Sequence, residues 1–223
     1  MGTLYLVRHG QASLGADDYD QLSALGLRQC ELLGEYFAQQ GITFDALIAG
    51  TLRRHKQTLA GILQGMRHQD EHLPWAGLNE YDSEAVIAAI HPQPLVRPDT
   101  PELVRQHFRL LREGLAAWME GRTQPERMPS YPDFVSGVVG ALDHVRANHF
   151  GRRVLVVSSG GPISTAVAQV LGAAPAASIE LNLRLRNTSV TEFAFNPKRL
   201  SLVTFNTLPH LDAPGLRASV TYA

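Results

Sequence analysis

Residues 3–13, TLYLVRHGQAS, decide the fold, because a short apolar, β-prone run leads directly into a polar cluster. This order predicts a buried strand that ends in a loop. The same order of an apolar run and a polar loop occurs again at residues 153–161, RVLVVSSGG. This apolar run is typical of a strand buried on both faces, and the two glycines after it lead into a predicted helix. Alternating strands and helices predict an α/β fold: a three-layer α/β/α sandwich on a mostly parallel sheet, with ligands bound at the carboxyl ends of the strands.

The remaining elements follow from hydrophobic periodicity and from turn residues. Ser23 is the expected N-cap of a helix that ends near Gly41. Asn196-Pro197-Lys198 separates two alternating segments and predicts a hairpin. We expect strands at 46–49, 189–195 and 200–205, and helices at 24–41, 52–66, 84–90, 101–118, 133–148 and 163–171.

The chain length bounds the domain organisation. The 223 residues are 44% hydrophobic, which is enough for one sizeable core and short for two full domains. We therefore expect one domain over residues 1–223. A Pro-rich, less periodic stretch from about Pro92 to Pro132 interrupts the alternation, and we expect it to be a helical cap insertion over the site.

Charge and cysteine usage exclude several classes of function. A formal net charge of -1 leaves no basic excess to attract phosphate backbones or anionic lipid, so we expect no nucleic-acid or membrane partner. The single cysteine, Cys30, excludes an internal disulfide framework and a cysteine zinc cluster. The opening MGTLYLVRHG lacks the basic-then-apolar order of a signal peptide. These features predict a cytoplasmic location and leave the oligomeric state open.

Three donor-rich loops are candidates for binding one anion. Arg8-His9-Gly10 lies where the first strand ends, Arg54 lies at the start of the helix after the second strand, and Gly160-Gly161 opens another helix. Helix starts expose unpaired N–H groups and partial positive charge, and glycines let the main chain approach a bound oxyanion. We therefore expect the three loops to converge at one edge of the sheet.

Several segments, in this order along the chain, carry a resemblance to a known family. They are LVRHGQ at 6–11, YDQLSALGLRQCELLGEYF at 19–37, AGTLRRHKQT at 49–58, LNE at 78–80 and VLVVSSGG at 154–161. Through them the chain resembles the histidine phosphatase superfamily, the phosphoglycerate-mutase-like proteins, over nearly its whole length. The third segment follows the family pattern S-x-L-x-R-A-x-Q-T, which identifies Arg54 and not Arg53 as the second arginine.

The resemblance implies phosphomonoester hydrolysis through a phosphohistidine, without a metal or other cofactor, on a small phosphorylated substrate. It makes His9 the nucleophile and Glu80 the general acid that protonates the leaving oxygen, with Asp82 and Glu84 as nearby rivals. Glu80 can act as an acid near neutral pH only if its surroundings raise its pKa. The implied substrate-binding residues are Arg8, Gly10, Gln11, Arg54, Ser159 and Gly160.

One departure from the family pattern bears on activity. The second histidine of the family falls at Ser159, so a neutral hydroxyl replaces a charged donor. A charge-assisted hydrogen bond contributes about 1.5–3 kcal/mol against about 1 for a neutral one, which implies a roughly tenfold loss in rate. Two interpretations stay open: an attenuated phosphatase, or a degenerate phosphate-ester-binding or regulatory protein. His210 is either a third site histidine or an ordinary loop or core histidine.

The loop after the first strand favours a hydrolase over a phosphoglycerate-mutase-type phosphotransferase. Such mutases follow RHG with a Ser, Trp, Asn run, whereas residues 11–20 read QASLGADDYD. Asp17 and Asp18 disfavour a substrate with a second phosphate if they face the entrance. A serine hydrolase is disfavoured because Ser159 lacks the G-x-S-x-G context. The physiological substrate cannot be inferred from these residues.

Overall fold

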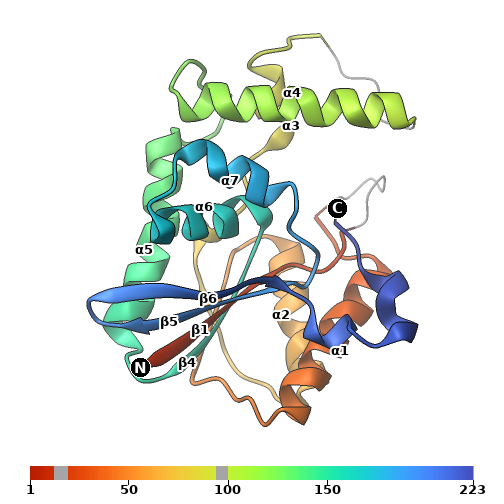
Figure 1. Ribbon diagram of the computed structural model, residues 1–223, viewed down its shortest axis with the longest axis vertical. Coiled ribbons are helices and arrows are strands. Elements are labelled where there is room, and N and C mark those ends of the chain that lie inside the picture. The colour runs from red at the N-terminus through yellow and green to blue at the C-terminus, as the bar shows by residue number, and fades with distance from the viewer. Residues whose placement is uncertain (13–19, 94–99, 223) are drawn as a thin grey trace.

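The computed structural model describes residues 1–12, 20–93 and 100–222 (Figure 1). Its centre is a six-stranded sheet in the order β3-β2-β4-β1-β5-β6. The strands are β1 Gly2–Arg8, β2 Ala46–Ala49, β3 Leu73–Pro74, β4 Arg153–Ser158, β5 Val190–Asn196 and β6 Arg199–Thr207. The first four strands run parallel to one another, whereas β5 and β6 form an antiparallel hairpin beside β1.

Helices occupy most of the connections between strands. They are α1 Ala24–Gln39, α2 Arg53–Gly65, α3 Ser83–Ala88, α4 Pro101–Met119, α5 Tyr131–Asn148, α6 Gly160–Leu171 and α7 Pro175–Asn182. Short 3₁₀ helices lie at Ala76–Leu78, Pro209–Leu211 and Pro214–Ser219. Among the residues described, no helix combines the length and the apolar character that a membrane crossing requires.

The central strands are buried on both faces, which explains their continuous apolar runs. Side chains of a strand alternate between faces, so Val154 and Val156 of β4 join one hydrophobic cluster and Leu155 and Val157 join the other. Helices α1 and α2 cover one face of the sheet, and α5 and α6 cover the other (Figure 1). The prediction of a three-layer α/β/α fold on a mostly parallel sheet is confirmed.

Three local features differ from the sequence prediction. Strand β3 is two exposed residues long, and α7 carries little amphipathic pattern, so neither gave a signal. Helix α6 begins at Gly160 and not at Ile163, which makes Ser159 its N-cap residue. Pro162 is tolerated there because the N–H that proline lacks has no helical partner in the first turn.

The segment 92–132, expected to be a cap, contains α4. This helix packs against α3, α5 and α7, and it lies beyond α7 from the sheet (Figure 1). Residues 94–99 of the segment fall outside the described residues. The role of this segment as a cap, and the organisation of the chain as one domain, stay predictions.

Helices α1 and α2 approach closely through glycines, and this contact positions the start of α2. A Cβ atom on Gly34 would lie 2.0 Å from the carbonyl oxygen of Ile62, and one on Gly65 would lie 2.1 Å from that of Glu31. Only glycine permits this spacing, because an added methyl would overlap the facing main chain. The close packing holds Arg54, in the first turn of α2, at the edge of the sheet.

Replacing Gly34 with alanine should therefore force α1 and α2 apart. We expect Gly34→Ala to lower the free energy of unfolding by about 1–3 kcal/mol, measured by denaturant titration. The matched control is Gly140→Ala in α5, where the nearest atom to a new Cβ lies at an ordinary 3.5 Å. The control should be neutral or stabilising by up to about 1 kcal/mol. Equal stability of the two variants would contradict this account of the packing.

Candidate active site

His9, Gly50 and Ser159 each follow directly on one of three neighbouring parallel strands, β1, β2 and β4. Hydrogen bonds align these strand ends: the His9 N–H donates to the Ser158 carbonyl at 2.9 Å, and the Gly50 N–H donates to the Val157 carbonyl at 3.0 Å. The carboxyl ends of parallel strands thus bring residues from three distant segments to one edge, as expected for a ligand site of an open α/β sheet.

His9 is a buried, neutral imidazole with one nitrogen already occupied. Its side chain is 4% exposed, and its Nδ1 lies 2.7 Å from the carbonyl oxygen of Gly10. Because a carbonyl only accepts hydrogen bonds, Nδ1 carries the proton and Nε2 keeps its lone pair. Burial lowers the pKa of His9 well below its usual value, and the positive charges of Arg8 and Arg54 lower it further.

The main chain around His9 forms hydrogen bonds with groups from two other segments. The amide nitrogen Nδ2 of Asn187 and the N–H of Thr188 donate to the His9 carbonyl at 3.2 and 3.3 Å. The N–H of Gly10 donates to Thr58 Oγ1 at 3.1 Å. These bonds hold the main chain of His9 and Gly10 in place, and the Gly10 carbonyl in turn orients the imidazole through Nδ1.

Arg8 and Arg54 are both largely buried, and acceptors hold each of them. The Nη1 of Arg8 donates to the carbonyl oxygens of Leu185 and Tyr222, each at 2.5 Å. The Nη1 of Arg54 forms an ion pair with Asp20 at 2.9 Å. Both guanidinium groups act electrostatically on His9, so positive charge of the kind that attracts an anion lies close to the imidazole.

Glu80 rests on the N-terminus of α6. The N–H of Gly161 donates to both carboxylate oxygens at 3.1 Å, and a Cβ atom on Gly161 would lie 2.2 Å from Oε1. Loss of hydration raises the pKa of this partly buried carboxyl, while the Gly161 N–H and the charges of Arg54 and Arg8 oppose the rise. The raised pKa is the condition that general acid chemistry by Glu80 requires.

Asp82 and Glu84, the rivals of Glu80, have other surroundings. Asp82 is the N-cap of α3, and its carboxylate accepts from the N–H groups of Glu84 and Ala85. Both side chains are exposed, whereas Glu80 lies near the two arginines. The geometry thus favours Glu80 over Asp82 and Glu84 for a role at the cluster, the group of buried side chains around His9 and the two arginines.

Ser159 is buried at the end of β4, the strand next to the one that ends before His9, and it contacts a second histidine that the sequence analysis did not single out. The Oγ of Ser159 lies 2.7 Å from Nε2 of His55, and the ring centroids of His55 and His9 are 5.9 Å apart. Burial, with the charge of Arg54, lowers the pKa of His55 to about 3. The signal was present in RRHKQT, where histidine stands at the alanine of the family pattern.

A family comparison identifies this arrangement. The model of the histidine phosphatase superfamily (branch 1) matches residues 4–208. The chain belongs to the histidine phosphatase superfamily. A search of curated proteins found no match.

Solved structures share the fold of this superfamily member. Phosphoserine phosphatase of Entamoeba histolytica matches with a TM-score of 0.67 and 21% identity, covering 95% of this chain and 100% of that one. A mycobacterial glucosyl-3-phosphoglycerate phosphatase matches with a TM-score of 0.65 and 22% identity, and the match covers 92% of this chain and 98% of that one. Phosphoglycerate mutase of Bacillus anthracis matches with a TM-score of 0.64 and 17% identity, and the match covers 93% of this chain and 94% of that one. At these identities the likeness establishes the fold alone.

Two further predicted residues of this superfamily member, Gly160 and Gln11, have defined contacts. A Cβ atom on Gly160 would lie 2.0 Å from Oδ1 of Asn182, so glycine is needed where α7 meets the start of α6. The Oε1 of Gln11 accepts from the Ser23 hydroxyl at 2.8 Å, which directs this side chain toward the start of α1. Asp17 and Asp18, considered above as entrance charges, lie outside the described residues.

His210 is connected to His9 through Thr188. Its Nε2 lies 2.9 Å from the Thr188 hydroxyl, which itself donates to the Asn187 carbonyl, so Nε2 is the donor. The N–H of Thr188 in turn donates to the carbonyl of His9. Burial lowers the pKa of His210 to about 3. This position favours a core histidine that supports the loop, and not a third histidine in the cluster.

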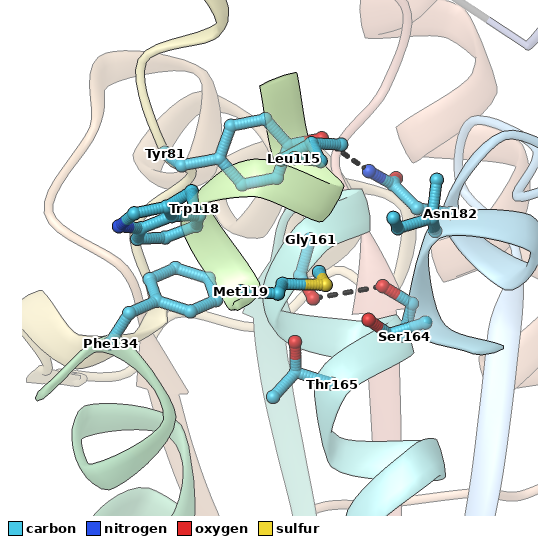
Figure 2. A pocket seen from close by; sticks show the side chains of 11 residues that line it. Tyr81, Leu115, Trp118, Met119, Phe134, Gly161, Ser164, Thr165 and Asn182 are labelled. Carbon is cyan, nitrogen blue, oxygen red and sulfur yellow. Dashed lines mark hydrogen bonds between the residues drawn. The ribbon is translucent and has the colours of Figure 1, made fainter. Parts of the chain in front are cut away.

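A small pocket lies between α4 and the loop that carries Glu80 and Tyr81. Figure 2 shows Tyr81 and Trp118 on one side of it and Gly161 and Asn182 on the other, with Nδ2 of Asn182 donating to the Tyr81 hydroxyl at 2.6 Å. The pocket measures about 10 Å³, enough for roughly one water molecule. It is a packing gap and has no room for a substrate.

Metal ligands do not cluster in the parts of the chain that the structure covers. Across residues 1–12, 20–93 and 100–222, no group of three His, Cys, Asp or Glu side chains is arranged to hold a metal ion.

The buried histidines predict a specific dependence of stability on pH. His9, His55 and His210 are neutral in the folded chain, so only the unfolded chain takes up their protons as the pH falls below about 6.5. The free energy of unfolding should therefore fall with decreasing pH. His210→Gln keeps a donor for Thr188 but cannot titrate, and its slope between pH 6.5 and 5 should be shallower by up to about 1.4 kcal/mol per pH unit.

Denaturant titrations of both proteins at several pH values measure the two slopes. Equal slopes would mean that His210 takes up its proton in the folded state and would contradict its burial as a neutral group.

Proposed function

We propose that this chain is a metal-independent phosphomonoester hydrolase that acts through a phosphohistidine on His9. Membership of the histidine phosphatase superfamily supports a phosphatase-type enzyme in general terms. The observation that carries the specific proposal is the state of His9, whose protonated Nδ1 bonds the Gly10 carbonyl and leaves Nε2 as the only basic nitrogen. The nearby arginines supply the charge that a phosphoryl group requires.

In the first step, Nε2 of His9 attacks phosphorus, and the bond between phosphorus and the ester oxygen breaks. Glu80 gives its proton to the leaving oxygen, which its raised pKa supports. Arg8 and Arg54 offset the negative charge on the oxygens of the transferring group. The products are an alcohol and a phosphohistidine, with Glu80 now a carboxylate.

In the second step, a water molecule attacks the phosphohistidine. The Glu80 carboxylate takes a proton from the water, the phosphorus–nitrogen bond breaks, and the electron pair returns to Nε2 of His9. Inorganic phosphate leaves, and the site regains its starting protonation. Both steps use the same carboxyl group in opposite directions.

A small phosphate ester is the substrate class we propose. Solved relatives with this fold are named for phosphoserine and for glucosyl-3-phosphoglycerate, which are small molecules with a phosphate group. A second candidate function, binding of phosphate esters without turnover, is favoured by one observation: a neutral hydroxyl, that of Ser159, stands where the family pattern has its second histidine. Phosphoryl transfer of the mutase type is a lesser alternative.

Turnover of an aryl phosphate in the presence of a chelator separates these candidates. The wild-type chain should release phosphate between acid and neutral pH, and His9→Ala should abolish release by removing the nucleophile. The matched control is His68→Ala, which removes an exposed imidazole just beyond α2 and should leave the rate unchanged. Vanadate binding without turnover by the wild type, over a panel of esters, would support the binding protein instead.

Arg54 should contribute strongly to anion affinity. Arg54→Ala should weaken vanadate binding by about 10- to 100-fold, because charged hydrogen bonds are lost from a buried site. Lysine should substitute poorly, since it cannot offer the planar guanidinium fork. Arg53→Ala is the control, because Arg53 is the exposed neighbour in the same turn. Weaker binding by the Arg53 variant, with the Arg54 variant unchanged, would reverse the assignment.

A further inference from the structure

Two buried side chains of the cluster, His55 and Ser159, form a pair that the steps above do not use. Both are buried, and Nε2 of His55 lies 2.7 Å from Oγ of Ser159. His55 follows Arg54 in the first turn of α2, and Ser159 precedes α6. The His55 ring lies near His9, with 5.9 Å between the two ring centroids.

The surroundings of the His55 ring fix which nitrogen carries the proton. Nδ1 is buried and has no hydrogen-bond partner among the described residues. It faces Gly50, where a Cβ atom would lie only 2.1 Å away, so the ring is seated against bare main chain. A buried N–H without an acceptor is rarer and costlier than an unused lone pair, so the proton is on Nε2. Nε2–H therefore donates to the oxygen of Ser159.

This direction of donation leaves the proton of Ser159 for another acceptor. Ser159 is the N-cap residue of α6, yet its hydroxyl makes no bond to the helix. Among the described residues its hydroxyl has one hydrogen-bond partner, His55. A hydroxyl that accepts from an imidazole N–H is polarised and becomes a better donor itself. The hydroxyl proton of Ser159 is thus available to a ligand at the carboxyl ends of β1 and β4, where His9, the proposed phosphoryl acceptor, also lies.

We infer that the Ser159 hydroxyl donates to an oxygen of the phosphoryl group opposite His9, and that His55 is the residue that positions and polarises it. The inference rests on the proposed site for a phosphoryl group and extends it by one residue. Ser159 touches the substrate, whereas His55 acts through Ser159. The pattern quoted for the family has alanine at 55 and histidine at 159, so the two departures of this chain contact each other and compensate.

A double-mutant cycle on vanadate affinity tests the pair, because vanadate binding needs no turnover. Ser159→Ala and His55→Ala should each weaken binding by about 5- to 10-fold. The double variant should lose no more than the Ser159→Ala single variant, since His55 acts only through the hydroxyl. His68→Ala serves as the exposed-histidine control and should bind as the wild type does. Multiplicative losses, or an unchanged His55→Ala, would overturn the inference.

An exchange of the two side chains gives an independent readout. The double substitution His55→Ala with Ser159→His removes one imidazole and supplies another, and it should restore vanadate affinity to near the wild-type value. Ser159→His alone should lower the melting temperature, because the new ring enters space that the His55 ring already borders. A folded exchange variant that binds no better than His55→Ala with Ser159→Ala would also overturn the inference.

Two outcomes separate this inference from the proposed function. If the wild type turns over no ester but the cycle shows the expected coupling, the hydrolase proposal fails and the donor pair stands. If the wild type binds no vanadate, both fail. Should His55→Ala not fold, His55→Leu replaces it in the cycle, and His55→Gln, which keeps an N–H donor, should retain more affinity than His55→Leu.

Discussion

The parallel pairing of β4 with β1 on one side and with β2 on the other is the constraint on which the site depends. It brings the ends of three strands to one edge of the sheet, so that His9, Gly50 and Ser159, the residues that follow these strands, lie in adjacent positions. Burial on both faces stabilises this arrangement, because alternate side chains of β4 fill two separate hydrophobic clusters. A shift of register by one residue would exchange those faces, and the strand ends would no longer meet.

Electrostatics then determines the chemistry of the edge. Two buried guanidinium groups lie near an imidazole that burial keeps neutral, and a carboxyl group with a raised pKa faces the same space. Each shift has a physical cause in the fold: dehydration of His9 and Glu80, the charges of Arg8 and Arg54, and the Gly161 N–H that holds the carboxylate. The result is a site with a nucleophile, a proton donor and positive charge, all suited to a phosphoryl group.

The sequence predicted the parts of this arrangement that depend on local pattern. Apolar runs and turn residues predict a strand at about residues 3–7 and a helix from about residue 52, where the structure has Gly2–Arg8 and Arg53–Gly65. The resemblance to the histidine phosphatase superfamily singled out His9 and Glu80. The sequence could not predict contacts between distant segments. The His55–Ser159 bond joins residues 104 positions apart, each on a different motif, and no periodicity reports such a pair.

The acceptors that hold the arginine side chains could not be predicted from the sequence either. The carbonyl of Tyr222, which accepts from Arg8, is 214 positions away in sequence, and main-chain acceptors leave no trace in side-chain identity. The sequence analysis did not predict α7, whose Asn182 packs closely against Gly160, for a different reason. Its eight residues, PAASIELN, lack the apolar spacing of a surface helix, because it packs between α6 and α4.

The central claim is that His9 is a neutral imidazole with its proton on Nδ1 and a free lone pair on Nε2. Nitrogen NMR of the chain labelled with ¹⁵N-histidine tests it most directly, with the His9 signals assigned by their loss in His9→Ala. The account predicts that His9 is still neutral at pH 6.0, with Nδ1 protonated, although an ordinary histidine with a pKa of about 6.5 is mostly charged there. A His9 that titrates near 6.5, or that carries its neutral-form proton on Nε2, would contradict it.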